Sequence, residues 1–428
     1  MSRRVVISGV GLVSAAGCGI DAVWNRLVSA PPVPSVFTGP EPAASISFPL
    51  YRAEPYQLGD LGVPERCLRW LEDERLAGAR DLEHLLGSTA LALRDAGLPL
   101  DCSQADGRAA VVVGNESPGF TALSQALFRF GSDGPPPADP RERYDGLAER
   151  FFQLNTFLLP HYLARAFRLE GLTLFVNSAC TSGLNALDIA AQEIRAGRSR
   201  IAIAAAADDP ASVAKFLWFD QQGLYSRDGS LRPFDARQLG TVFGDGGAAL
   251  VLEDLESALG RGARIYAEYL GAGFSQDGWK IAAPSPVKAS AVQALERAFG
   301  EAGVGREDVD LVVPHGVGTA ASDQYESMVL HRVFGALDRW PAVTALKPFV
   351  GHNLGGSALL ELAILLAAIA RETVPPTLGF ERPLPRNPLP LVRDWEPRRI
   401  EIAAKLTCGF AGFYGAAVFR RCGEGSIP

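Results

Sequence analysis

The sequence predicts an α/β fold in two related halves, and three observations support this prediction. Strand-like apolar runs alternate with helical patterns along the whole chain, which is typical of α/β proteins. At 428 residues the chain exceeds the size of one usual hydrophobic core. A faint internal repeat favours two homologous halves that meet near residue 260. It pairs Leu93–Gly97 and Val111–Gly114 with Glu301–Gly303 and Leu311–Val313.

In the first half, apolar runs rich in β-branched residues alternate with helical patterns. The opening run from Arg4 to Ser8 predicts a strand, and Gly9-Val-Gly11 after it predicts a glycine turn. Apolar residues spaced three and four apart predict the helices of this half. The expected later strands are 110–113, 172–176, 200–204 and 243–253, and the expected helices are 85–96 and 183–194.

The second half repeats this scheme. Val292, Leu295 and Phe299 mark the buried face of one helix. Leu362–Ala370 is apolar throughout, but this run is too short to span a bilayer. It therefore predicts a core helix that continues to about Arg371, and no membrane span is expected. The expected strands are 264–268, 310–313, 342–346, 400–405 and 416–420.

One segment departs from the alternation. Residues 116–169 are rich in phenylalanine and contain Gly134-Pro-Pro-Pro137. We expect an insertion that forms a pocket wall or a subunit interface. A surface excursion that only covers the core is the alternative.

The overall composition argues against several functional classes. A formal net charge of -7 disfavours nucleic acid as the main partner. The six cysteines are scattered without a Cys-x-x-Cys pair, which fits free thiols in the reducing cytoplasm. The five histidines form no His-x-x-x-His pair, so no metal is expected. Gly9-Val-Gly11 lacks the third glycine of a dinucleotide-binding loop, so no permanently bound cofactor is expected.

Cys180 is the strongest functional candidate because it lies between a strand and a helix. The apolar run 172–176 stops at small and polar residues, and a helical pattern begins at Gly183. A helix N-terminus favours the thiolate, which is the nucleophilic form of cysteine. His315 and His352 each follow a predicted strand and lie among glycines, so they are candidates to complete a Cys-His-His site. For an isolated cysteine, simple packing in the core is the alternative.

In order and spacing, the motifs resemble those of β-ketoacyl-acyl carrier protein synthases, condensing enzymes of the thiolase superfamily. The resemblance covers nearly the whole chain and implies a thiolase fold, with duplicated halves in a five-layered αβαβα sandwich. The halves are expected at 1–260, with the nucleophilic cysteine, and at 261–428, with both histidines. The motifs are Phe175–Gly183, Arg232–Asp235, Gly244–Gly246, His315–Thr319 with Asp323 and Glu326, Lys347 with His352 and Glu361, and Gly409–Gly412.

The resemblance implies a decarboxylative Claisen condensation. Cys180 would accept an acyl group, and a malonyl thioester would lose carbon dioxide to give an enolate that attacks the acyl-cysteine. His315 and His352 would stabilise the negative charge on the enolate oxygen. Backbone N–H groups of Cys180 and Phe410 would form an oxyanion hole, with Phe410 also acting as a gate. By the same resemblance, Lys347 with Glu361 would orient His352, Asp323 and Glu326 would hold the His315 loop, and Thr319, Val317 and Phe413 would contact the substrate.

Three departures from the family pattern concern the substrate. Val317 stands where threonine is common, so one hydrogen bond to pantetheine is expected to be missing. Phe413-Tyr414 replaces the usual Thr-Asn, and Gly355-Gly-Ser357 is unusual. We therefore expect a specialised polyketide or lipid pathway rather than bulk fatty-acid elongation.

Three other functions stay open at this point. Cys408 lies near the position of a catalytic cysteine in thiolases, which condense without decarboxylation; thiolases, however, carry asparagine in place of the first histidine. A non-condensing subunit that sets chain length is the second alternative, although such subunits lack the nucleophile. Acyl transfer to an alcohol or amine is the third.

The resemblance also implies the partners. An acyl carrier protein is expected, with substrates carried on phosphopantetheine of that protein or of coenzyme A. A homodimer is expected, and a heterodimer with a chain-length partner is the alternative. Arg66, Arg69 and Arg75 beside Trp70 form a candidate docking surface for an acidic carrier protein, and a solvated helix face is an equal alternative.

Overall fold

The central sheet of the computed structural model repeats one strand arrangement twice. The described residues are 3–39, 43, 45–76, 78–105, 108–132, 139–287, 289–386 and 388–422, and within them this sheet has eleven strands. In spatial order the first half contributes β6 (Thr173–Val176), β5 (Ala110–Gly114), β7 (Ile201–Asp208), β9 (Gly246–Asp254) and β1 (Val5–Ser14), with β2 (Gly17–Cys18) beside β1. The second half contributes β12 (Ala342–Val343), β11 (Leu311–Val313), β15 (Ile402–Cys408), β16 (Phe413–Arg420) and β10 (Ala267–Gln276).

Numbered along the chain, both halves therefore have the strand order 3-2-4-5-1. Parallel and antiparallel pairs also match: β5 is parallel to β6 and β7, as β11 is to β12 and β15. The first strands of the two halves pair antiparallel, with Val5 opposite Tyr269. This repetition is the duplication that the sequence predicts.

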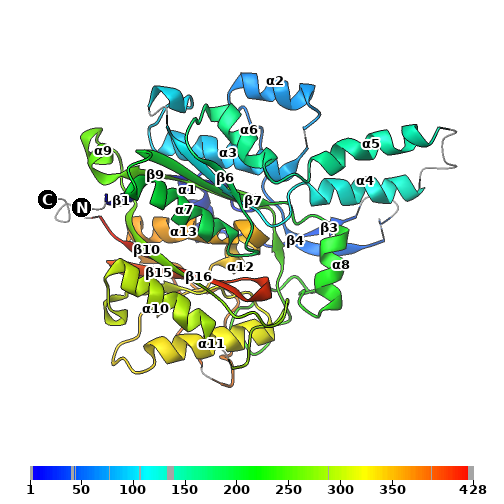
Figure 1. The fold of residues 1–428 in the computed structure, drawn as a ribbon. Coiled ribbons are helices and arrows are strands. Elements are labelled where there is room, and N and C mark those ends of the chain that lie inside the picture. Colours follow the sequence, from blue (N-terminus) through cyan, green and yellow to red (C-terminus); the bar gives the residue numbers. More distant parts are fainter. Residues whose placement is uncertain are drawn as a thin grey trace.

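Helices complete five layers, which Figure 1 shows from top to bottom. The layer between the two half-sheets holds the helices α7 and α13, and each outer layer holds helices of one half only. The predicted αβαβα sandwich is confirmed. The bounds are α3 (Arg80–Asp95) and α6 (Leu158–Phe167) outside the first half, α7 (Ser182–Arg195) and α13 (Ser357–Arg371) in the middle, and α10 (Ser290–Ala302) and α11 (Ala320–Phe334) outside the second half.

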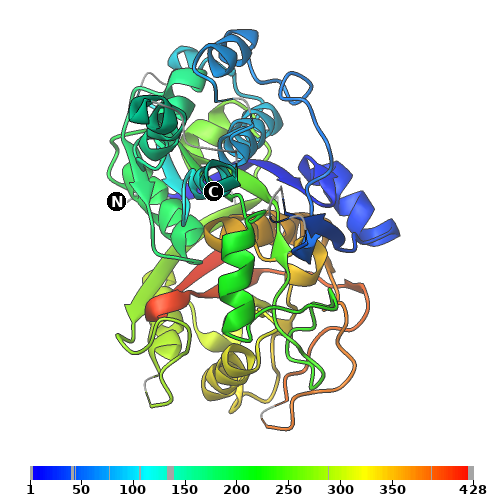
Figure 2. The same ribbon diagram turned by 90° about the vertical axis from the view of Figure 1, so that its right-hand side faces the viewer.

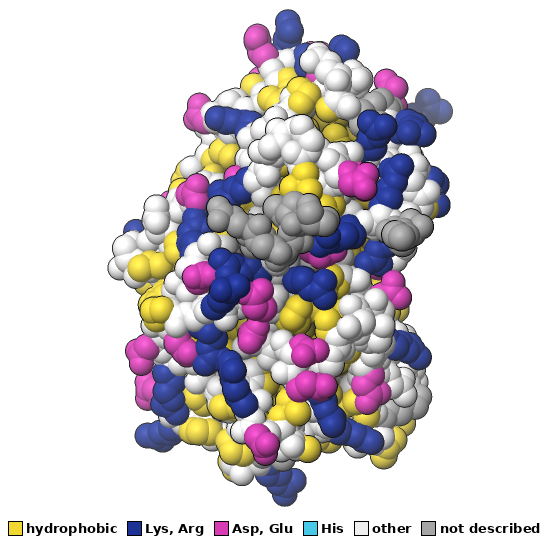
Figure 3. Space-filling model, turned by 90° about the vertical axis from the view of Figure 1, so that its left-hand side faces the viewer, with side chains coloured by type: hydrophobic (Ala, Val, Ile, Leu, Met, Phe, Trp, Pro, Cys, Tyr) yellow, Lys and Arg dark blue, Asp and Glu magenta, His cyan; other side chains and the backbone are white. Residues whose placement is uncertain are grey.

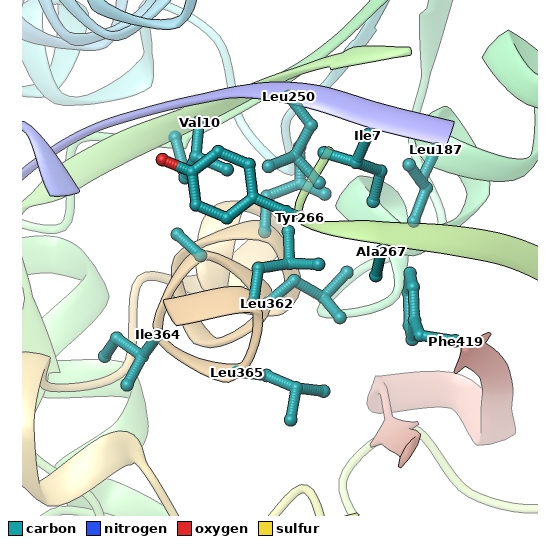
Figure 4. Close-up of a cluster of buried hydrophobic side chains, with 14 of the residues drawn as sticks. Ile7, Val10, Leu187, Leu250, Tyr266, Ala267, Leu362, Ile364, Leu365 and Phe419 are labelled. Carbon is teal, nitrogen blue, oxygen red and sulfur yellow. The ribbon is translucent and has the colours of Figure 1, made fainter. Parts of the chain in front are cut away.

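The core around α13 joins the two halves. Its leucines and isoleucines pack against β1, β9 and β10, and Figure 4 shows this cluster around Leu362 and Tyr266. The stretch Leu354–Arg371 is long and apolar enough to cross a membrane, but 89% of it is buried inside the protein. It is therefore a core helix, as its apolar run predicts.

The glycine turn predicted after the first strand is wrong, because β1 continues to Ser14. A Cβ on Gly9 would lie 2.3 Å from the carbonyl oxygen of Ala92, and one on Gly11 would lie 2.0 Å from that of Ser88. Both contacts are with α3. The glycines thus let a helix approach the strand closely instead of turning the chain.

Other elements shift in their bounds. The strand expected at 264–268 begins only at Ala267, and the one expected at 342–346 is two residues long. The helix expected from residue 85 begins at Arg80. Smaller elements are α1 (Ile20–Ser29), α2 (Glu65–Asp73), α9 (Leu255–Gly260), α12 (Lys347–Val350), the sheet of β3 (Ser35–Thr38), β4 (Ser47–Tyr51) and β8 (Phe243–Gly244), and the pair of β13 (Thr373–Val374) and β14 (Glu396–Pro397).

The predicted insertion 116–169 consists of two different parts. The helices α4 (Phe120–Ser132) and α5 (Pro140–Phe152) extend from the body as an arm (Figure 1), whereas α6 belongs to an outer layer and packs in the core of the first half. Gly134-Pro-Pro-Pro137 lies outside the described residues. Helix α8 (Val213–Gln221) stands upright at the front of Figure 2.

Candidate functional site

Cys180 lies in a tight turn between β6 and α7. Ala179 before it has a φ of 52°, an uncommon conformation for a residue with a side chain. The turn is fixed by its own side chains: the Thr181 hydroxyl donates to the Ser178 carbonyl (2.7 Å), and the Ser182 hydroxyl accepts from the Ser178 N–H (2.9 Å). The cysteine side chain is 2% exposed. The predicted strand-turn-helix setting is therefore present.

Both predicted histidines lie beside this thiol. His315 follows β11, and His352 follows α12 from another part of the second half. Cys180 Sγ lies 3.5 Å from His352 Nε2. One ligand atom from each of the three residues lies within 4.8 Å of the others, and the two rings are 5.5 Å apart at 83°. Such a trio is also close enough to bind a metal ion. The positive charge of the buried Lys347 beside His315 would, however, repel a metal cation at this place.

The two histidines are neutral because they are buried. Burial lowers the pKa of both imidazoles well below the usual value, and the charge of Lys347 lowers them further. Lys347 Nζ lies 3.1 Å from His315 Nδ1 and 2.6 Å from the His315 carbonyl oxygen. Since an ammonium group only donates, His315 Nδ1 accepts and its proton is on Nε2.

The expected role of Lys347 as the residue that orients His352 needs correction. Lys347 bonds to His315, whereas His352 Nδ1 lies 2.7 Å from the hydroxyl of Ser357. Ser357 is the first residue of α13, which begins five residues after His352. The sequence analysis did not identify Ser357 as the partner of His352; it noted only that Gly355-Gly-Ser357 departs from the family pattern.

Lys405 is a site residue that the sequence analysis missed. The carboxylate of Glu361 bonds to Lys347 through Oε1 (2.6 Å) and to Lys405 through Oε2 (2.9 Å). Lys405 also donates to the carbonyl of Pro314, directly before His315 (3.0 Å). All three charged side chains are buried. The sequence did contain a signal: Lys405 is the single charged residue in the apolar strand β15. A lysine is rarely buried without a charged partner, so this position predicts a buried ion pair.

Asp323 and Glu326 hold the His315 loop, as expected. Glu326 accepts the backbone N–H groups of His315 (2.5 Å) and Gly316 (2.8 Å). Asp323 accepts those of Val317 (3.2 Å) and Gly318 (3.1 Å). Burial raises the pKa of both carboxyl groups to about 7.

A cavity of about 50 Å³ is lined by the trio and by half of the other predicted site residues. Val317 and Thr319 line it, as do Phe410 and Cys408. The expected substrate contact of Phe413 needs correction: the neighbouring Tyr414 lines the cavity, whereas Phe413 does not, because alternate residues of β16 face opposite sides. The Tyr414 hydroxyl donates to Asp277 (2.9 Å).

Phe410 combines two features at this cavity. Its backbone N–H makes a hydrogen bond to the Cys180 sulfur. Its ring packs against Trp218 and Phe219 of α8, with ring centres 5.6 and 5.3 Å away. The side chain therefore lies at the wall of the cavity beside α8, whose Phe219 also lines the cavity.

The expectation of a resting thiolate at Cys180 is wrong. Burial raises the pKa of the thiol, and the nearby carboxyl of Glu116 raises it further. Lys347 and the N–H of Phe410 act in the opposite direction but do not prevail. Loss of hydration thus opposes the partial charge of the helix N-terminus. The group that attacks must therefore lose its proton during the reaction.

The arginines considered for docking lie along α2 and at its end. Arg66, Arg69 and Arg75 are exposed, and Arg66 donates to the carbonyl oxygen of Ala166 (2.8 Å). Trp70 is buried and stacks on Tyr162, with ring centres 5.2 Å apart. The tryptophan thus belongs to the core rather than to a docking surface.

Comparison with known proteins identifies relatives along the whole chain. Residues 2–258 match the model of the beta-ketoacyl synthase N-terminal domain, and residues 266–381 match that of its C-terminal domain. The 3-oxoacyl-[acyl-carrier-protein] synthase 2 of Rhizobium meliloti is 28% identical, over 98% of this chain and 99% of its own. The ketoacyl synthase alpha subunit of the tetracenomycin polyketide synthase of Streptomyces glaucescens is 29% identical, over 98% and 97%.

Solved structures show the same fold. The ishigamide ketosynthase/chain length factor superposes with a TM-score of 0.84 at 27% identity, over 99% of this chain and all of the matched chain. A beta-ketoacyl synthase from Burkholderia phymatum gives a TM-score of 0.84 at 27% identity, over 98% and 100%.

Proposed function

Since the chain belongs to the beta-ketoacyl synthase family, we propose that it catalyses a decarboxylative Claisen condensation on carrier-bound substrates. An acyl group on Cys180 would react with a malonyl-type thioester on an acyl carrier protein to give a 3-oxoacyl thioester. The observation that carries the proposal is the meeting of one thiol and two neutral imidazoles within 4.8 Å.

In the first step, the acyl group moves to the enzyme. The Cys180 sulfur attacks the thioester carbonyl while its proton passes to His352 Nε2, which lies 3.5 Å away. The N–H groups of Cys180 and Phe410 hold the oxyanion. The bond to the carrier sulfur then breaks, and that sulfur leaves with the proton. This route starts from a neutral thiol, in agreement with the raised pKa of Cys180.

In the second step, the malonyl thioester loses its carboxylate as carbon dioxide. The electron pair of the broken carbon–carbon bond forms an enolate, whose oxygen accepts hydrogen bonds from Nε2–H of His315 and of His352. The enolate carbon attacks the acyl carbonyl, the carbon–sulfur bond to Cys180 breaks, and the released thiolate takes up a proton from water. Neutral histidines suit this step because each ring carries one N–H group, which can donate a hydrogen bond to the enolate oxygen.

Ser357 allows His352 to serve both steps. A hydroxyl both donates and accepts, so it can bond to Nδ1 in either tautomer of the ring. When Nδ1–H donates to Ser357, Nε2 accepts the thiol proton; when Ser357 donates to Nδ1, Nε2–H faces the enolate.

The pathway is a specialised one in this proposal. Val317 and Tyr414 line the cavity at positions where the chain departs from the family pattern. Of the two similar enzymes described above, the one from Streptomyces glaucescens is a subunit of a polyketide synthase, and the one from Rhizobium meliloti is named a 3-oxoacyl-[acyl-carrier-protein] synthase. In this proposal the substrates are carried on phosphopantetheine of an acyl carrier protein or of coenzyme A.

We further propose that a second chain pairs along β6. This strand is at the edge of the large sheet and has no partner on its outer side among the described residues. Leu174 in this strand and Leu172 directly before it are each 37% exposed. Exposed apolar edge strands are typical sites of pairing between chains. A second copy is the occupant we favour, and a chain-length partner, like the chain length factor named with the ishigamide ketosynthase, is the alternative.

Acyl loading tests the nucleophile. The protein is incubated with a panel of acyl-carrier thioesters and its intact mass is measured. We expect the mass of one acyl group per chain in the wild type and none in Cys180→Ser. An unmodified wild-type mass with every donor would contradict the proposal.

A further inference from the structure

A second cavity adjoins the one around the thiol. Its volume is about 360 Å³, and it shares Phe219 and Phe410 with the first cavity. Helix α8, upright at the front of Figure 2, supplies four lining residues. Most of the wall is aromatic or aliphatic. The lining residues are Glu116, Ser117, Phe120, Ala214, Lys215, Trp218, Phe219, Leu354 and Phe410.

Glu116 is the acidic side chain of this wall. It follows the end of β5, and its backbone N–H donates to Asp208 (3.1 Å). A Cβ added to Gly355, three residues after His352, would lie 2.9 Å from the Glu116 nitrogen. The residue is therefore fixed directly against the His352 loop. Its charge also acts on the Cys180 thiol, since it raises that pKa.

The carboxyl of Glu116 is incompletely paired. Its Oε2 atom is buried and has no hydrogen-bond partner within the described part of the chain. Lys215 lines the same wall, but its ammonium group donates to the carbonyl of Asp209 (2.7 Å). Burial raises the pKa of Glu116, and Lys215 only partly offsets this. A buried polar oxygen without a partner is costly, so a polar ligand group at this carboxyl would be favoured.

We propose that the second cavity receives an acyl group that carries a hydrogen-bond donor, a hydroxyl or an amino group, which bonds to the Glu116 carboxyl. This inference rests on the proposed function, because the acyl group reaches the cavity by its bond to Cys180. Phe219 and Phe410 line both cavities, so an acyl group on Cys180 would pass beside these two rings. An unsubstituted alkyl chain would exclude water from the Glu116 carboxyl without offering it a hydrogen bond in return, so its binding would be disfavoured.

The experiment compares acyl thioesters of equal size on N-acetylcysteamine, so that carrier docking does not enter. Pentanoyl, 3-hydroxybutyryl and 3-aminobutyryl thioesters are offered singly, and the rate of Cys180 acylation is followed by intact mass. We expect at least one of the two polar donors to load about tenfold faster than pentanoyl in the wild type. In Glu116→Leu the ratio of polar-donor to pentanoyl loading rates should fall to about one, whatever the change in the absolute rates.

Two further variants make the result specific. Glu116→Gln keeps the shape and one acceptor oxygen, so it should keep a preference for the hydroxyl over the alkyl donor. Glu170→Gln, at an exposed position outside the cavity, should load like the wild type. Equal or faster loading of pentanoyl in the wild type, or a polar preference that survives in Glu116→Leu, would overturn the inference. If no thioester loads either from N-acetylcysteamine or from an acyl carrier protein, the proposed function fails as well.

Discussion

At the scale of single residues, the site depends on how each imidazole is held. Lys347 fixes the proton of His315 on Nε2, because an ammonium group occupies Nδ1. Ser357 leaves His352 free to adopt either tautomer. The two histidines are thus unequal: one is a fixed donor, and the other can exchange a proton with Cys180.

Ser357→Ala is expected to slow both partial reactions. The variant leaves the buried Nδ1 of His352 without a partner, which costs about 1–3 kcal/mol and corresponds to roughly five- to 150-fold in rate. Acyl loading is measured by intact mass and decarboxylation by carbon dioxide release. Ser357→Thr keeps the hydroxyl and should restore both rates. Wild-type rates in Ser357→Ala at unchanged thermal stability would exclude the role assigned to this hydroxyl.

The pH dependence of thiol alkylation follows from the raised pKa of Cys180. Below its pKa, the thiolate fraction of a thiol rises tenfold for each pH unit. The rate of iodoacetamide modification of Cys180 should therefore keep rising through pH 9, beyond the range where an ordinary thiol levels off near its pKa of about 8.5. A plateau at pH 7 or below would instead indicate a resting thiolate–imidazolium pair.

The motifs identified the reacting groups but not how they contact one another. Cys180, His315 and His352 stand in recognisable sequence contexts, and all three meet in the structure. Ser357 and Lys405 were missed because hydrogen-bond partners depend on side-chain directions that spacing does not give. The thiolate expected at Cys180 was wrong because a sequence shows the helix terminus but not the loss of hydration.

At the scale of elements, α3 lies in close contact with β1. Gly9 and Gly11 lie under Ala92 and Ser88 of that helix. Glycine after a short apolar run is usually a turn signal, which explains why the sequence analysis ended the strand too early. Only the packing of the helix on the strand distinguishes the two uses of glycine.

Gly11→Ala should destabilise the protein, because its Cβ would lie 2.0 Å from the Ser88 carbonyl oxygen. Overpacking of this kind costs about 1–3 kcal/mol in the free energy of unfolding. Gly260→Ala is the matched control, since an added Cβ there meets no atom within 4 Å. Urea unfolding of both variants gives the comparison. Equal stabilities of the two variants would contradict the packing described for β1 and α3.

At the scale of the whole molecule, the duplication places the nucleophile in one half and both histidines in the other. The order 3-2-4-5-1 occurs in each half, and α7 and α13 lie together between the half-sheets. The strand pattern predicted two related α/β halves, and the family resemblance implied the layered sandwich and this division of the site residues. The bounds of short strands such as β12 did not follow from either. On the face in Figure 3, basic and acidic side chains are interspersed, so carrier docking is better sought on another face.

The proposed dimer along β6 can be tested by the oligomeric state of the protein. We expect a mass of two chains by light scattering in the wild type. Leu174→Asp, which places a charge on the exposed edge strand, should shift the mass toward one chain. Val28→Asp alters a similarly exposed apolar residue on α1 and should leave the dimer intact. A dimer that survives in Leu174→Asp at micromolar concentration would exclude this edge as the interface.

The central claim, decarboxylative condensation on Cys180, is tested most directly by the ratio of carbon dioxide to product. An acylated enzyme is supplied with malonyl thioester labelled in its free carboxyl group, and labelled carbon dioxide and 3-oxoacyl product are measured together. We predict one carbon dioxide for each product, and in His315→Ala or His352→Ala a loss of both, while His315→Ala still loads its acyl group. Product formed from an acetyl thioester without carbon dioxide would contradict the claim and indicate a thiolase-type reaction.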